Sequence, residues 1–146
     1  MKLYIDSNAL VSLYANDNPN DALLTRKAIE AASEIVTSPI TYSEVRAAFK
    51  ALHHNKRITK REYLQAVQDF DRDWSTIQTL EVNDALALLA GALADTHLLK
   101  GCDAIHVATA VTFQSLSNDL KFLTFDLQLE KRIAAASIVP LWDSGS

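Results

Sequence analysis

Short apolar runs recur along the chain and alternate with longer segments whose apolar positions follow the period of a helix. The runs typical of buried strands are residues 3–5, 34–37, 76–80, 122–125 and 138–139. The helical segments between and after them are residues 9–15, 21–32, 41–54, 60–74, 103–115 and 127–136, together with a helix after Asn83 that carries the apolar residues of 85–94. Strands that alternate with helices in this way predict an α/β fold with a parallel sheet covered by helices on both faces.

Two helix starts carry clear local signals. Thr59 followed by Glu62 fits a capping box, and Asn83 is a suitable N-cap for the apolar helix that follows it. Thr41 and Glu44 have the same spacing, so a second capping box is an alternative use for Glu44.

The composition predicts one globular domain over residues 1–146. Hydrophobic residues make up 49% of the chain and charged residues 22%, which excludes a disordered protein. The single cysteine, Cys102, excludes an internal disulfide. The longest apolar stretch, residues 85–94, is shorter than the roughly 20 residues that cross a bilayer, and no signal peptide is visible. We therefore expect a cytoplasmic protein without membrane association.

The charge distribution is uneven. The net charge is −4, which argues against a broad nucleic-acid surface. Residues 53–61, however, contain two histidines and four lysine or arginine residues and no acid. This segment is a candidate contact for a phosphate backbone, and the alternative is a solvated turn between two helices.

Four acidic residues mark junctions between strand or loop and helix: Asp6, Glu44, Asp103 and Asp126. Asp6 and Asp126 follow apolar runs directly, at the end of a strand where open α/β sheets bind their ligands. Carboxylates gathered at one edge repel one another unless a hard cation lies among them, and Mg²⁺ prefers such oxygen ligands. This pattern predicts a metal-dependent site for phosphodiester cleavage.

Each acid also has a structural alternative. Asp103 and Asp126 stand where a helix N-cap is expected, and Asp6 can close a strand in an Asx-turn. A cap requires only one carboxylate per helix, whereas four acids that can converge favour a shared site.

Four blocks of the chain resemble the motif blocks of the PIN-domain nucleases, and in particular the VapC toxins of type II toxin–antitoxin pairs. The blocks are residues 5–8 (Ile-Asp-Ser-Asn), 43–48 (Ser-Glu-Val-Arg-Ala-Ala), 103–110 (Asp-Ala-Ile-His-Val-Ala-Thr-Ala) and 123–126 (Leu-Thr-Phe-Asp). The resemblance extends over essentially the whole chain. It implies a three-layer α/β/α PIN-like fold with a central parallel sheet of four to five strands.

The resemblance also implies an activity and a site. Members of the family are endoribonucleases that depend on Mg²⁺ or Mn²⁺, commonly form homodimers and are inhibited by a cognate antitoxin protein. By position, Asp6, Glu44, Asp103 and Asp126 would form the catalytic, metal-binding quartet. Ser7, Asn8 and Thr124 would support the carboxylates. Cys102 and Ala136-Ser137 depart mildly from the family pattern, and neither position belongs to the quartet.

Other functions remain as alternatives. A phosphatase of the haloacid dehalogenase type would need an acid two residues after Asp6, where this chain has Asn8. A non-catalytic module that binds RNA or protein would keep the fold without needing all four acids. His106, within an apolar helix, is expected to be a hydrogen-bonded core histidine rather than a catalytic base.

Overall fold

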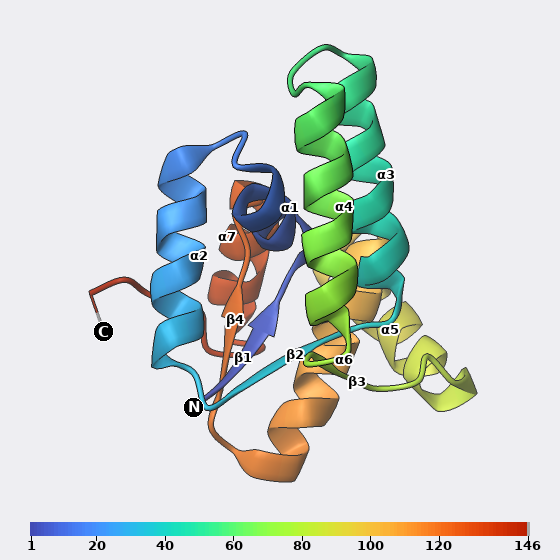
Figure 1. Ribbon diagram of the computed structural model, residues 1–146. Helices are drawn as coiled ribbons and strands as arrows, with labels where there is room; N and C mark the ends of the chain where they lie inside the picture. The colour runs from blue at the N-terminus through green and yellow to red at the C-terminus, as the bar shows by residue number, and fades with distance from the viewer. Residues whose placement is uncertain (146) are drawn as a thin grey trace.

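A computed structural model describes residues 1–145 of the chain, and Figure 1 shows their arrangement. The elements, in chain order, are β1 (Lys2–Ile5), α1 (Ser7–Ala15), α2 (Pro19–Ala31), β2 (Glu34–Thr37), α3 (Ile40–His54), α4 (Lys60–Trp74), β3 (Gln78–Thr79), α5 (Asp84–His97), α6 (Gly101–Ser117), β4 (Leu120–Leu123) and α7 (Leu127–Ala136).

The four strands form one parallel sheet in the order β3-β2-β1-β4. The two central strands, β1 and β2, therefore have a partner on each side, and the register places Tyr4 opposite both Val36 and Phe122. Because all strands run the same way, the carboxyl ends of β1, β2 and β4 lie along one edge. This edge receives the starts of α1, α3 and α7, the helices that follow these strands.

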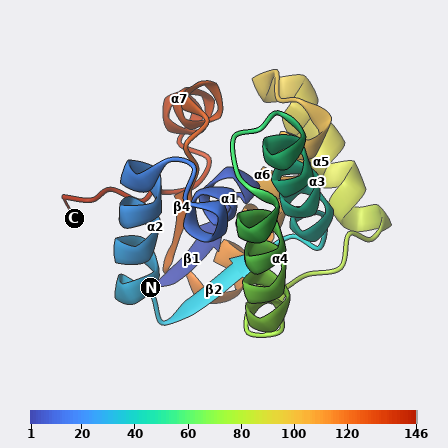
Figure 2. The same cartoon turned by 45° about the horizontal axis from the view of Figure 1, so that its top comes forward.

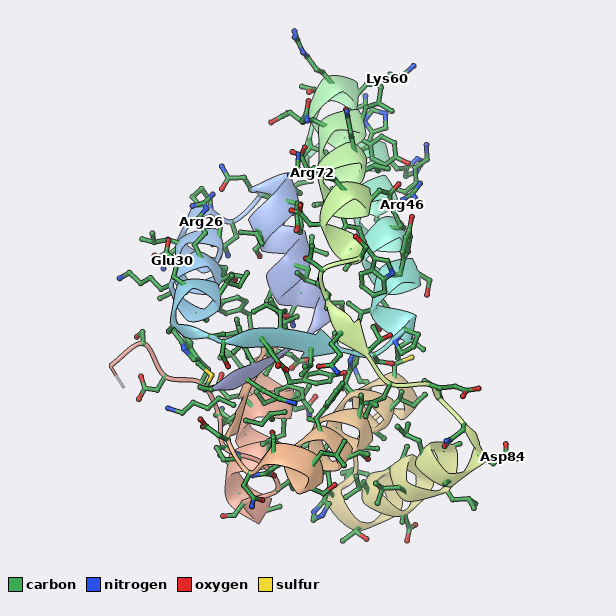
Figure 3. The ribbon with its side chains drawn as sticks, turned by 60° about the horizontal axis from the view of Figure 1, so that its bottom comes forward. Arg26, Glu30, Arg46, Lys60, Arg72 and Asp84 are labelled. Carbon is green, nitrogen blue, oxygen red and sulfur yellow. The ribbon has the colours of Figure 1, made fainter. Side chains whose placement is uncertain are left out.

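The side chains of β1 point alternately to the two faces of the sheet, and the hydrophobic core forms one cluster on each face. Leu3 and Ile5 point into one cluster, formed with α1 to α4, which includes Phe49 and Phe70. Tyr4 points to the opposite face, into a cluster formed with α5, α6 and α7. In Figure 2 helices α1 and α4 lie in front of the sheet, and Figure 3 shows α1 to α4 on one side of the strands and α5 to α7 on the other. The predicted three-layer α/β/α arrangement is confirmed.

The boundaries of several elements differ from the prediction. Strand β2 and helices α4 and α7 have the predicted bounds, and α5 begins after Asn83 as predicted. Helices α1, α2 and α6 each begin two residues earlier than predicted. Strand β3 is shortened to two residues, and β4 lies two residues before the predicted run.

The predicted fifth strand at residues 138–139 is wrong. Within residues 1–145 the segment after α7 pairs with the sheet only through a single bridge between Phe122 and Leu141. Pro140 lacks an N–H to donate, although its carbonyl accepts from the Phe122 amide at 2.8 Å. The sheet therefore has four strands, the lower of the two predicted numbers.

No single helix in the described part of the chain is long and apolar enough to cross a membrane. Helices α5 and α6 satisfy that test only when taken together, across a bend of 114°.

Candidate active site

Asp6 occupies the first position after β1 and connects that strand to α1. Its side chain is 6% exposed, and its Oδ1 accepts a hydrogen bond from the Ser7 amide at 2.8 Å, which caps α1. A buried carboxylate is costly unless hydrogen bonds or cations surround it. Asp6 therefore has a structural role, but as the N-cap of α1 and not in the predicted Asx-turn, whose bond would come from the amide two residues on. Its second oxygen faces the rest of the site.

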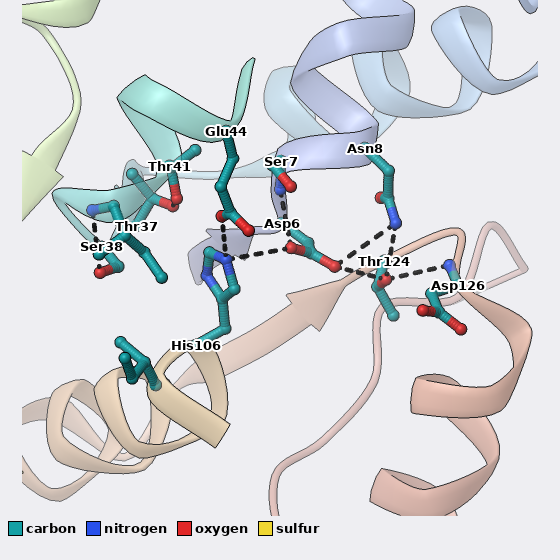
Figure 4. A network of polar contacts seen from close by, with 12 residues as sticks. Asp6, Ser7, Asn8, Thr37, Ser38, Thr41, Glu44, His106, Thr124 and Asp126 are labelled. Carbon is teal, nitrogen blue, oxygen red and sulfur yellow. Dashed lines mark hydrogen bonds and ion pairs between the residues drawn. The ribbon is translucent and has the colours of Figure 1, made fainter. Parts of the chain in front are cut away.

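The second oxygen of Asp6 is held by side chains from two elements (Figure 4). Thr124 donates its hydroxyl to Oδ2 at 2.8 Å, and the Asn8 amide donates to the same oxygen at 3.4 Å and to the Thr124 hydroxyl oxygen at 3.2 Å. The Asn8 side-chain oxygen accepts from the Phe125 amide at 3.1 Å. Asn8 and Thr124 therefore fix Asp6 to the end of β4, whereas Ser7 contributes its backbone amide.

Glu44 does not cap its own helix. Helix α3 begins after Pro39 without a side-chain cap, and Thr41 is buried and shares a hydrogen bond of 2.8 Å with Thr37. The alternative of a Thr41–Glu44 capping box is wrong. The Glu44 side chain, 30% exposed, instead points to His106 and accepts a hydrogen bond of 2.6 Å from its Nε2 (Figure 4).

His106 joins two of the four acids. Its ring is 1% exposed, and its Nε2 lies 2.6 Å from Glu44 Oε1 and 3.5 Å from Asp6 Oδ1. Burial lowers the pKa of the imidazole, but the hydrogen bond to Glu44 and the charges of Asp6, Glu44 and Asp103 outweigh it, so the net direction is up. The expectation of a hydrogen-bonded core histidine is confirmed.

Tyr4 supports His106 from inside the core. The Tyr4 hydroxyl lies 2.7 Å from His106 Nδ1, and its ring stacks on Phe122 at a centroid distance of 4.9 Å. Burial and the charge of Asp6 raise the Tyr4 pKa well above its ordinary value, so the phenol keeps its proton. Because a carboxylate only accepts, Nε2 of His106 carries the proton that binds Glu44 in either charge state of the ring.

Tyr4→Phe is expected to lower the free energy of unfolding by about 1–3 kcal/mol, because it leaves a buried His106 nitrogen without its partner. Urea unfolding measures the loss. When His106→Phe is already present, removal of the same hydroxyl should cost clearly less, since the nitrogen is then absent. Equal costs in both backgrounds would show that the hydrogen bond contributes nothing to stability.

Asp103 lies in the first turn of α6 but is not its N-cap. That position belongs to Lys100, which makes no side-chain cap, so the N-cap alternative for Asp103 is wrong. Burial raises the pKa of the Asp103 carboxyl, as do the charges of Asp6 and Asp126, while His106 and Lys100 oppose them. Asp103 therefore lies within the electrostatic field of two other acids of the predicted quartet.

Asp126 has a confirmed structural role. Its Oδ1 accepts from the amides of Gln128 at 3.0 Å and Leu129 at 3.2 Å, which caps α7. Its own amide donates to the Thr124 hydroxyl at 3.1 Å and so joins Asp126 to the Asp6 network. The second carboxylate oxygen takes no part in this cap, and Asp126 can serve the helix and the acidic site together.

The donors at this edge fit a hard divalent cation. Within residues 1–145 no lysine or arginine forms an ion pair with any of the four acids. As the side chains lie, no three acidic, histidine or cysteine side chains of the described residues are placed to hold one metal ion. Mg²⁺ needs fewer, because it usually keeps several waters and binds one or two carboxylates together with substrate phosphates.

A shallow recess of about 280 Å³ adjoins the acids. Asp103 forms part of its wall, together with Leu98, Leu99, Lys100, Gln128, Leu129 and Arg132. Arg132 donates to the Leu98 carbonyl and is thereby fixed across the gap between α5 and α7. The acidic edge is thus open to a ligand on the side of α6 and α7.

The sequence prediction did not identify the connection through His106 and Tyr4. A signal was present, since His106 lies three residues after Asp103 and residues at that spacing share a helix face. The partner of His106 depends on how α6 packs against α3, which no local pattern encodes.

The chain is similar to known proteins in sequence and in fold. The family model of the PIN domain matches residues 3–134. Two curated relatives from Mycobacterium tuberculosis, Ribonuclease VapC45 of strain CDC 1551 / Oshkosh and Ribonuclease VapC49 of strain ATCC 25618 / H37Rv, are each 30% identical over 109 residues. These residues cover 75% of this chain and 74% of the relative in both cases.

Two solved structures share the fold. A toxin–antitoxin complex from Klebsiella pneumoniae matches with a TM-score of 0.63 and 24% identity, over 94% of both chains. VapBC2 from Rickettsia felis, bound to a DNA fragment from its promoter, matches with a TM-score of 0.65 and 12% identity, over 97% of this chain and 98% of that one.

Proposed function

This chain belongs to the PIN-domain family, and on that premise we propose that it is a metal-dependent endoribonuclease, the toxin of a toxin–antitoxin pair. The relatives that carry the name ribonuclease support the reaction class. The observation that carries the proposal is the gathering of Asp6, Glu44 and Asp103 around His106 at the carboxyl edge of the sheet. Acids from three separate elements converge there, which helix capping alone does not require.

The four acids would divide the work of holding the cation, Mg²⁺ or Mn²⁺. Asp6 and Asp103 would bind it directly, Glu44 would bind a second ion or orient water, and Asp126 would act partly through water. When bound, such an ion neutralises phosphate charge and lowers the pKa of a coordinated water. The substrate is RNA, and the reaction is hydrolysis of a phosphodiester bond.

The remaining residues of the site keep these carboxylates in place. Thr124 and Asn8 hold one oxygen of Asp6, the Ser7 amide holds the other, and His106 holds Glu44. Side chains that are already positioned lose little freedom when the substrate binds, which is a recognised source of rate enhancement. A catalytic role for the quartet therefore rests on its supporting hydrogen bonds as much as on the acids themselves.

The proposed partners are a cognate antitoxin and a second copy of the chain. The two structural neighbours are toxin–antitoxin and VapBC complexes, which supports an antitoxin for this protein. The homodimer is proposed from the family resemblance.

Cleavage of total cellular RNA by the purified protein tests the proposal. We expect discrete fragments in millimolar Mg²⁺ or Mn²⁺ and none in EDTA, because the carboxylates alone cannot neutralise a phosphodiester. Activity should return when the ion is restored in excess, with the far-UV circular dichroism unchanged throughout. Cleavage that continues in EDTA would contradict the role of the metal.

The second candidate, a non-catalytic PIN-fold module that binds RNA or protein, makes the opposite prediction. A correctly folded protein that cleaves no RNA with any of these ions would favour this module.

A further inference from the structure

Helices α3 and α4 form a hairpin whose tip stands out from the body of the protein (Figure 1). Six of the chain's 14 lysine and arginine residues lie in residues 45–61, which contain none of its 18 acids. On a chain with a net charge of −4, such a segment is a local reversal of sign. Like charges that lie close together repel one another, so the fold alone does not account for this cluster of cations.

Two of these six cations are used inside the hairpin. Arg46 donates to the Tyr42 hydroxyl at 2.7 Å, and Lys50 lies over the ring of Tyr63 at 5.3 Å. Both contacts join α3 to residues of the hairpin itself, so Arg46 and Lys50 have structural roles.

The other four cations have no such role. Lys56, Arg57, Lys60 and Arg61 are all exposed, and none forms an ion pair within residues 1–145. The acid nearest in sequence, Glu62, accepts from the Thr59 amide at 2.8 Å in the capping box of α4. In Figure 3 the Lys60 side chain extends from the tip away from the body. These four residues are referred to below as the hairpin cations.

The hairpin connects its cations to the acidic site through α3. Glu44 lies near the start of this helix and His54 at its end, ten residues and about 15 Å further along the axis. A strand stacked as in a duplex carries one phosphate per 3.4 Å or so of helix axis, so this distance spans about four stacked nucleotides. A strand held at the acids can therefore reach the hairpin only if it continues for several nucleotides.

We propose that the hairpin cations bind the phosphate backbone of the RNA substrate, several nucleotides from the bond that is cut. This inference rests on the proposed function, which supplies RNA as the substrate. Contacts of this kind read no sequence. The hairpin would thus favour long or structured RNA over short fragments, while the choice of bond stays with the acidic site.

The test compares two triple variants in an Asp103→Asn background, which prevents cleavage during the measurement. The hairpin variant carries Lys56→Asn, Arg57→Gln and Lys60→Gln; asparagine is chosen at Lys56 because its φ is +58°. The matched control carries Arg26→Gln, Lys27→Gln and Lys131→Gln, three exposed cations on α2 and α7. Both variants lose three positive charges, so general repulsion of RNA changes equally. The probe is a fluorescent single-stranded RNA of mixed sequence, titrated in Mg²⁺ over a range of salt concentrations.

For the hairpin variant we expect the slope of log K against log salt to fall by about 2, since each lost phosphate contact removes about 0.7. The Kd for RNA should rise about ten-fold or more near physiological salt, and an oligonucleotide of about three nucleotides should show no difference. The control variant should keep the slope of its parent. Equal slopes in the two variants would overturn the proposal. The proposal would also be overturned if the hairpin variant bound RNA as its parent does but no longer bound polyglutamate. The hairpin cations would then be a binding surface for an acidic protein.

The outcome is independent of catalysis. If the parent chain with Asp103 restored cleaves no RNA, the proposed activity fails while a slope difference between the variants still supports the hairpin contact. If the parent cleaves RNA and the two variants bind it alike, the hairpin contact fails and the activity stands.

Discussion

Asp103→Asn is expected to lower the rate of RNA cleavage by about 10²–10⁴-fold while the fold is retained. Losses of this size are typical when one charged member of a catalytic group is neutralised. Of the four positions, Asp103 is the one where a substitution disturbs the fold least, because its side chain makes no hydrogen bond or ion pair within residues 1–145. Asp6, by contrast, caps α1 and binds Asn8 and Thr124, so its replacement would disturb the fold as well.

When no metal is present, Asp103→Asn should raise the free energy of unfolding or leave it unchanged, although the same substitution lowers activity. The pKa of Asp103 is raised by burial and by the charges of Asp6 and Asp126, so the folded state disfavours the ionised carboxyl. The parent chain therefore loses stability as the pH rises from the unfolded pKa, about 3.9, through the higher folded value. The Asp103→Asn variant avoids this loss, because its amide does not ionise. We expect it to unfold in EDTA at an equal or higher urea concentration than the parent at neutral pH, with the difference vanishing at acid pH.

Added Mg²⁺ should reverse this order. Binding to the folded state alone stabilises it by about 1.4 kcal/mol when the free ion is at ten times its Kd, and the variant should lack most of this gain. Asp84→Asn is the matched control, since Asp84 is an exposed acid in the first turn of α5 and lies outside the site (Figure 3). A variant at Asp103 that cleaves RNA as fast as the Asp84 control would remove Asp103 from the catalytic group.

The sequence predicted those features that depend on local chemistry. The Thr59–Glu62 capping box and the Asn83 cap were both confirmed, because each needs only residues within one turn of helix. Strand β2 was predicted with its observed bounds, since a β-branched run closed by Ser38-Pro39 leaves little ambiguity. The same local signals predicted that Asp6 follows a strand directly, which is confirmed. Asp126 stands three residues after the end of β4, because that strand ends at Leu123 and not at Phe125.

Features that depend on packing between distant elements were not predictable in this way. Thr41 and Glu44 have the spacing of a capping box, yet Thr41 bonds to Thr37 and Glu44 to His106. A helix cap is favoured by about 1 kcal/mol. A buried histidine next to two acids gains more from a charged partner than that cap provides. Tertiary contacts therefore decided the orientation of Glu44.

The end of the chain is a second case. Residues 138–139 have the apolar, β-branched character of a strand, but a strand needs a continuous set of partners. The chain meets β4 only at Leu141, beyond Pro140, and a single bridge results. Apolar character predicted burial correctly for Val139, which is 4% exposed, but not the hydrogen-bonded ladder.

Phe70→Ala is expected to lower the free energy of unfolding by about 3–5 kcal/mol, the range for a phenylalanine removed from a packed core. Phe70 is fully buried in α4 and lies at the centre of an aromatic cluster. Its ring lies 5.4 Å from Tyr14 and from Tyr42, 5.9 Å from Phe49 and 5.5 Å from Trp74, measured between centroids. These partners come from α1, α3 and α4, so one side chain joins the hairpin to the helix that follows Asp6.

The effect should extend to function, because α3 carries Glu44 as well as Tyr42 and Phe49. With a total stability of about 5–15 kcal/mol for a domain, the expected loss would be a large part of the whole. Urea unfolding followed by tryptophan fluorescence measures it. Phe70→Leu keeps most of the volume and should cost clearly less, while RNA cleavage at low temperature should stay close to that of the parent. A loss of less than about 1 kcal/mol in the free energy of unfolding for Phe70→Ala would show that the aromatic cluster does not hold the hairpin against α1. The position of Glu44 would then depend on its hydrogen bond to His106 alone.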